Sequence, residues 1–162
     1  ISKSAIESLL RLPGQFDCPV SILRLTGVYG PKDRGASVVG RLLKQMQEDG
    51  TVTLFGDGSS RRDFVQVENV ADVVLRVIDE PFDGNLNVAA GVSLTMLEIV
   101  ETIGKCAGIS PAINFRPEDV NTPKYLVFDV SEMNARYPGL EFTTLEAGTA
   151  NYVANLDQVP SN

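Results

Sequence analysis

The stretch from Gly56 to Val74 constrains the fold of this chain more than any other. It reads GDGSSRRDFVQVENVADVV, in which a glycine-bracketed turn precedes an arginine pair, an alternating segment and an apolar helical pattern. The alternation in Asp63–Val67 predicts a half-buried strand. Asn69 is expected to cap the helix that follows. An arginine held between a turn and a strand is well placed to grip an anion, because its planar fork matches the paired oxygens of a phosphate.

The segments on either side of this stretch alternate between helical and strand patterns. Val20–Leu25 is a nearly continuous apolar run, which suits a parallel strand covered on both faces. A helix from about Val38 should end at Gly50. Two further helices are expected to open with capping boxes, and short strands are expected between them. The boxes are Thr95–Glu98 and Thr143–Glu146, and the strands are 52–55, 85–89, 112–115 and 125–128. This alternation predicts an α/β fold.

Composition excludes several classes of function. The net charge of −7 argues against a nucleic-acid or membrane-surface binder, which would carry a basic face. The absence of histidine excludes a histidine-based triad and any histidine-ligated metal within the chain. No apolar run approaches the roughly 20 residues of a membrane span. No signal peptide is visible, so we expect a cytoplasmic protein, with Cys18 and Cys106 buried and reduced.

Four segments carry residues suited to binding or catalysis, and each has an ordinary structural alternative. Lys3, near a helix start, has the alternative of a solvated lysine. Arg24–Pro31 follows a strand, where ligands of open α/β sheets gather, but it also resembles a turn that closes a strand. Arg62 has the alternative of a surface ion pair with Asp63. Phe115–Asp119 has the alternative of a loop with ordinary charges.

The order of these segments resembles the extended short-chain dehydrogenase/reductases, the NAD-dependent epimerases and dehydratases of nucleotide sugars. That family has a catalytic tyrosine four residues before a lysine, then an "R…NVYGP" strand end, a "GDG…RDF" motif and a C-terminal "RPGD". This chain shows, in the same order, Lys3, Arg24–Pro31, Gly56–Asp63 and Arg116–Asp119. The similarity covers residues 1–155, and 156–162 is expected to be a loose tail. The resemblance implies the C-terminal part of a Rossmann-type parallel sheet plus a small α/β substrate-binding subdomain.

The resemblance also implies roles for individual residues. Lys3 corresponds to the lysine that bonds the nicotinamide ribose of NAD or NADP and lowers the pKa of the tyrosine. Leu25 falls where the backbone contacts the nicotinamide. Arg62 and Arg116 correspond to two arginines that clamp the diphosphate of a nucleoside-diphosphate sugar. The other substrate-binding positions are Thr53 and Phe55 at the base, Asp119 near the nucleotide ribose, and Gly27, where the family has asparagine.

The implied reaction is transient oxidation of a nucleotide-linked sugar by bound NAD or NADP, followed by epimerisation, dehydration or reduction. The glycine-rich dinucleotide loop is not in the sequence, and the tyrosine would lie two residues before Ile1. We therefore expect the C-terminal half of a longer polypeptide, which forms a homodimer when full length. Two alternatives stay open. One is a non-catalytic nucleotide-sugar-binding module, which Gly27 and Gln66 slightly favour because they depart from the family's residues. The other is a reductase of a non-sugar substrate, which would not need both arginines.

Overall fold

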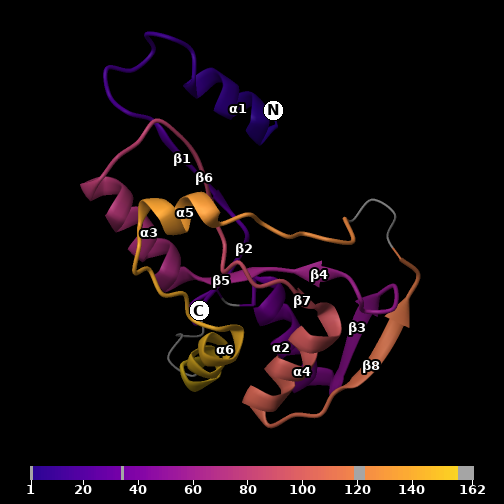
Figure 1. Ribbon diagram of the computed structural model, residues 1–162. Helices are drawn as coiled ribbons and strands as arrows, with labels where there is room; N and C mark the ends of the chain where they lie inside the picture. Colours follow the sequence, from indigo (N-terminus) through magenta and orange to yellow (C-terminus); the bar gives the residue numbers. More distant parts are fainter. Residues whose placement is uncertain (1, 34, 119–122, 157–162) are drawn as a thin grey trace, which may run out of the picture.

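The computed structural model describes residues 2–33, 35–118 and 123–156, in which pairs of parallel strands lie among helices (Figure 1). The helices are α1 (Lys3–Leu10), α2 (Val38–Asp49), α3 (Val67–Asp79), α4 (Met96–Ala107), α5 (Ser131–Arg136) and α6 (Leu145–Ala154). The strands are β1 (Ser21–Leu25), β2 (Gly27–Tyr29), β3 (Thr51–Phe55), β4 (Arg61–Arg62), β5 (Phe64–Gln66), β6 (Gly84–Val88), β7 (Leu94–Thr95) and β8 (Ala112–Arg116). β1 pairs with β6, β2 with β5 and β3 with β8, all in parallel, while β4 and β7 are antiparallel. The expected α/β class is therefore confirmed.

One apolar core lies beside the β1–β6 pair. In β6, Leu86 and Val88 are almost fully enclosed, and the other residues are partly exposed. α3 supplies Val73, which is fully buried, and α5 supplies Met133. The same cluster includes Phe82 and Tyr137. A short strand pair is thus stabilised by helices that come from distant parts of the chain.

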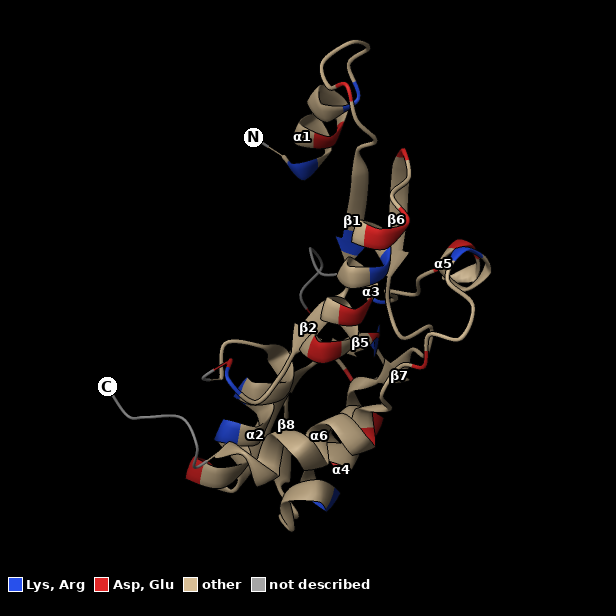
Figure 2. Cartoon of the chain, turned by 90° about the vertical axis from the view of Figure 1, so that its left-hand side faces the viewer, with Lys and Arg blue, Asp and Glu red and all other residues tan. Residues whose placement is uncertain are grey.

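A second core is built from α2, β3, α4 and α6, at the opposite end of the molecule from α1 (Figures 1 and 2). α2 buries the apolar face that its sequence predicts, and Gly50 ends it in the left-handed conformation with φ of 63°. α4 begins with the predicted capping box, in which the Thr95 and Glu98 side chains each bond the other's backbone N–H. The core residues are Tyr29, Val39, Leu42, Leu43, Met46, Val52, Leu54, Phe64, Ile99, Val100, Ile103 and Tyr152.

The segment Asp63–Gln66 runs between the two cores. Phe64, Val65 and Gln66 are all buried, because β5 pairs with β2 and is covered on both sides. The expectation of a half-buried, alternating strand is therefore wrong at this position. Its polar residue, Gln66, is enclosed rather than exposed to solvent.

Three local predictions are also corrected. Gln66, not Asn69, precedes α3, and the Asn69 side chain instead bonds Glu141 O and Thr143 N. α6 is capped by Thr144, whose side chain accepts from Ala147 N, so the box expected at Thr143–Glu146 is wrong by one residue. The strand expected at 125–128 is reduced to a single bridge between Tyr125 and Arg61.

The two cysteines are less buried than expected. Cys18 is exposed and Cys106 is partly exposed, so the prediction of buried thiols is wrong. In the part of the chain that the structure describes, none of the helices has the length and apolar character needed to cross a membrane.

Candidate functional site

Arg62 lies on β4, in the short antiparallel pair with β7. Its Nη1 donates to two main-chain carbonyls, Arg61 O at 2.7 Å and Lys124 O at 3.2 Å. The side chain is partly buried, and the loss of hydration lowers the pKa of its guanidinium. None of the ion pairs between described residues includes Arg62. The guanidinium is thus fixed by neutral oxygens and keeps its charge available for an anion.

Asp63 does not form the surface ion pair that its position beside Arg62 suggests. It is 2% exposed, and its two carboxylate oxygens accept from Ala90 N at 2.9 Å and Gly91 N at 2.8 Å. Its own main-chain carbonyl accepts from Thr26 Oγ1 at 2.7 Å. Burial raises the pKa of the Asp63 carboxyl, although the backbone donors act in the opposite direction. Asp63 therefore links the start of β5 to the residues that follow β1 and β6.

The carboxyl ends of β3 and β8 bring two more of the expected residues together. Phe55 and Arg116 are register partners at the last position of the two strands, and both are exposed. Gly56 N donates to Arg116 O at 2.8 Å, which holds the following turn against β8. Thr53 lies two positions earlier on β3, partly exposed, with its N–H directed to Gln45 Oε1 at 3.4 Å. Parallel strands commonly present ligand-binding residues at this edge.

Main-chain bonds hold residues 124–126, which follow Arg116 in the chain, beside Arg61. Arg61 N donates to Lys124 O at 2.9 Å, and Leu126 N donates to Arg61 O at 3.1 Å. The segment beyond Arg116 therefore returns beside β4. No bond between the Arg62 and Arg116 side chains occurs among the described residues, so their convergence on one ligand stays a prediction. Asp119 lies outside the described residues.

Lys3 lies on α1, and Leu25 ends β1 next to Thr26, whose hydroxyl donates to Asp63 O. Lys3 is exposed on the first turn of α1, which Ser2 caps through a bond from Ala5 N. Leu25 ends β1 and is 46% exposed. α1 runs antiparallel to β1, so its first turn lies towards the carboxyl end of that strand (Figure 1).

Gly27 begins β2 and packs closely against the ring of its register partner Phe64 on β5. A β-carbon added at Gly27 would lie 2.6 Å from Cδ1 of Phe64 and 2.7 Å from Cε1. That distance is about 1 Å inside an ordinary carbon–carbon contact. Packing thus explains why a glycine stands at the position of the family's asparagine. Gly27 therefore does not favour the alternative of a non-catalytic nucleotide-sugar-binding module.

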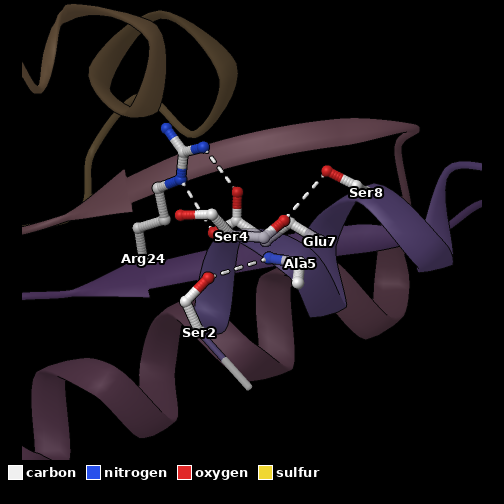
Figure 3. A network of polar contacts seen from close by, with 6 residues as sticks. All are labelled: Ser2, Ser4, Ala5, Glu7, Ser8 and Arg24. Carbon is white, nitrogen blue, oxygen red and sulfur yellow. Dashed lines mark hydrogen bonds and ion pairs between the residues drawn. The ribbon is translucent and has the colours of Figure 1, made fainter.

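The sequence did not reveal how α1 is held. Arg24 Nε donates to Glu7 Oε1 at 3.1 Å and Nη2 donates to Oε2 at 2.6 Å, a two-pronged ion pair between β1 and α1 (Figure 3). The bond to Arg24 lowers the pKa of Glu7, and the same bond raises the pKa of Arg24. The one signal in the sequence is that Glu7 follows Lys3 by about one helical turn, so that both side chains lie on the same face of the helix.

Comparisons with known proteins show which sequences and structures this chain resembles. Residues 1–89 match the sequence model of the NAD dependent epimerase/dehydratase family. An ADP-L-glycero-D-manno-heptose-6-epimerase of Alkalilimnicola ehrlichii is 30% identical over 176 residues, which cover 99% of this chain and 55% of that protein. An uncharacterized UDP-glucose epimerase of Bacillus subtilis, YtcB, is 27% identical over 162 residues, which cover 98% of this chain and 51% of that protein.

A solved structure gives the same result. The UDP-glucuronic acid 4-epimerase of Bacillus cereus, in complex with UDP-glucuronic acid and NAD, has a TM-score of 0.78 and 28% identity to this chain. The match covers 89% of this chain and 47% of that one. The chain therefore spans about half the length of the proteins that it matches. These similarities confirm both the fold class and the family resemblance.

Proposed function

We propose that this chain, which belongs to the NAD dependent epimerase/dehydratase family, supplies the sugar-nucleotide-binding part of an NAD- or NADP-dependent epimerase or dehydratase. The observation that carries the proposal is the partly buried guanidinium of Arg62, whose Nη1 donates to main-chain carbonyls. Arg62 has no carboxylate partner among the described residues, and a partly desolvated cation of this kind favours an anionic ligand, because ion pairing compensates for lost hydration. Relatives named for UDP- and ADP-linked sugars support a nucleoside diphosphate as that ligand.

In this proposal Arg62 on β4 and Arg116 on β8 hold the diphosphate from two sides, and main-chain bonds hold residues 124–126 beside Arg61. Charge-assisted bonds from both guanidinium groups neutralise the phosphates and fix the position of the attached sugar. Phe55 presents an exposed ring at the end of β3, so it is available to the base together with Thr53. Asp119 is proposed to bind the nucleotide ribose, and Gly27 to contact the sugar through its main chain.

The residues of α1 and β1 fit the nicotinamide end of NAD or NADP. Lys3 is exposed on the first turn of α1, and Leu25 is exposed at the carboxyl end of a parallel strand, where such cofactors bind. The cofactor, when bound, supplies reversible hydride transfer with the sugar. Lys3 donates hydrogen bonds to the ribose and, as a cation, favours the ionised form of an adjacent phenol. Homodimer formation and a cytoplasmic location stay predictions.

The proposal is tested by measuring the affinity of the complete protein for UDP-, dTDP- and ADP-glucose by calorimetry. We expect Arg62→Ala and Arg116→Ala each to weaken binding of the preferred sugar nucleotide roughly 10- to 150-fold, the equivalent of about 1.5–3 kcal/mol for a bond to a charged group. Arg62→Lys should recover part of the loss, because it keeps the charge but not the two-pronged geometry.

Arg76→Ala is the matched control. Arg76 is exposed on α3, so its removal changes the net charge equally without touching the proposed site. Its affinity should equal that of the unaltered protein. Failure of the unaltered protein to bind any nucleotide sugar, or equal affinities for the Arg62, Arg116 and Arg76 variants, would overturn the proposal.

A further inference from the structure

Helix α1 carries Lys3 but has little apolar support. None of its residues is buried, and Ile6 and Leu9 are 49% and 55% exposed. The helix is capped by Ser2 and bonded internally from Ser8 to Ser4. Packing against the rest of the described chain therefore does not by itself fix the orientation of α1.

One contact joins α1 to the sheet. Between residues 2–10 and the described residues beyond Leu12, the pair of bonds from Arg24 to Glu7 is the only hydrogen-bonded or ionic link (Figure 3). Arg24 is held in β1, where its register partner is Asn87 of β6. The charged fork thus connects an element fixed by the sheet to an element that is otherwise weakly attached.

The geometry of this link determines where Lys3 lies. Glu7 follows Lys3 by four residues, so the two side chains share one face of the helix. Two parallel bonds between a guanidinium and a carboxylate restrict rotation as well as distance, whereas a single bond restricts distance alone. Arg24 directly precedes Leu25. The fork therefore sets the rotation of α1 about its axis relative to the carboxyl end of β1.

We propose that Glu7 and Arg24 are positioning residues, which hold Lys3 at the cofactor site by fixing α1 against β1. This inference rests on the proposed function, because it assigns the pair a role in the same site. Neither residue touches the substrate; both act through Lys3. The side chain of Arg24 is 49% exposed and that of Glu7 21%, and an ion pair that is partly solvated contributes little to overall stability, so the main effect of the pair is on geometry.

The test uses the complete protein with Glu7→Gln, Arg24→Gln, Arg24→Lys and the charge reversal Glu7→Arg/Arg24→Glu. We expect each Gln variant to lower kcat roughly 10- to 100-fold, because a displacement of about 1 Å from the reactive geometry has that effect. NAD or NADP affinity, measured by titration without sugar, should weaken in parallel. KM for the sugar nucleotide and the midpoint of thermal unfolding should stay unchanged. Arg24→Lys should be intermediate, and the charge reversal should restore part of kcat and of cofactor affinity.

Glu146→Gln is the control, because Glu146 on α6 forms an ion pair of 2.7 Å with Lys105 on α4 and makes no contact with α1 or β1 in the ion pairs of the described residues. It should change none of these quantities. Unchanged cofactor affinity and kcat in both Gln variants, or losses that simply add in the Glu7→Gln/Arg24→Gln double variant, would overturn the inference. If the proposed function is wrong, the unaltered protein will not bind the sugar nucleotide. The cofactor titration does not depend on that result, so it still tests the role of the Glu7–Arg24 pair.

Discussion

Substitution of Gly27 by alanine tests the close packing of β2 against β5. Gly27 has a backbone conformation that any residue adopts, so only space opposes a side chain there. The new β-carbon would lie 2.6 Å from Phe64 Cδ1, and overpacking of this kind costs about 1–3 kcal/mol. The loss of glycine's freedom in the unfolded chain offsets about 0.4–1 kcal/mol of that cost. We therefore predict a net loss of about 0.5–2 kcal/mol in the free energy of unfolding.

The cause is identified by a double-mutant cycle with Phe64→Leu, followed by urea denaturation of the complete protein. In the Phe64→Leu background the ring carbons are gone, so Gly27→Ala should cost about 1 kcal/mol less than in the presence of Phe64. Gly30→Ala is the control. Its β-carbon would meet Val67 Cγ1 at 2.5 Å, so its cost should not depend on residue 64. An equal cost for Gly27→Ala in both backgrounds would refute the packing explanation of this glycine.

Three further predictions concern buried or capping groups. Burial raises the pKa of the folded-state Asp63 carboxyl above its value in the unfolded chain. The free energy of unfolding should therefore fall as pH rises from below about 4 through the folded-state pKa. Asp63→Asn should remove this contribution to the pH dependence of the unfolding free energy, measured by urea denaturation at a series of pH values. The Tyr29 hydroxyl is buried without a partner among the described residues, and burial raises its pKa to about 12, so Tyr29→Phe should leave the unfolding free energy unchanged or higher by up to about 1 kcal/mol; a loss above about 1 kcal/mol would contradict this. Thr95→Ala should cost about 1 kcal/mol in the same assay, and Thr95→Ser much less, because the capping box of α4 needs a hydroxyl; equal costs would contradict the cap.

Local patterns predicted most of the fold. The capping box at Thr95 and the glycine that ends α2 depend on residues three or four apart, so sequence spacing reveals them. Asn69 was expected as a cap because asparagine favours that position. In the structure the Asn69 side chain instead forms long-range hydrogen bonds with two main-chain groups beyond residue 140. No local pattern predicts the short helix α5, because its stability depends on the packing of Met133 against residues that are distant in the sequence.

The candidate site was predicted in part. Residue order and motif spacing single out Arg62, Arg116 and Lys3 as candidates, which stay predictions, but they do not show what holds these side chains. Arg62 is fixed by the carbonyl of Lys124, which is 62 residues away in sequence, and such a bond leaves no local pattern. The Glu7–Arg24 link is likewise set by tertiary geometry, since it joins a helix to a strand across 17 residues.

The most direct test of the diphosphate assignment compares the affinity of the complete protein for a nucleoside diphosphate with that for the corresponding monophosphate, for UDP and UMP and for ADP and AMP. With both Arg62 and Arg116 present, we predict that the diphosphate of the preferred base binds at least about 10-fold more tightly, equivalent to about 1.4 kcal/mol. In Arg62→Ala/Arg116→Ala that ratio should fall to about one, while the monophosphate affinity changes little. A ratio that survives the double substitution would contradict a clamp formed by these two arginines.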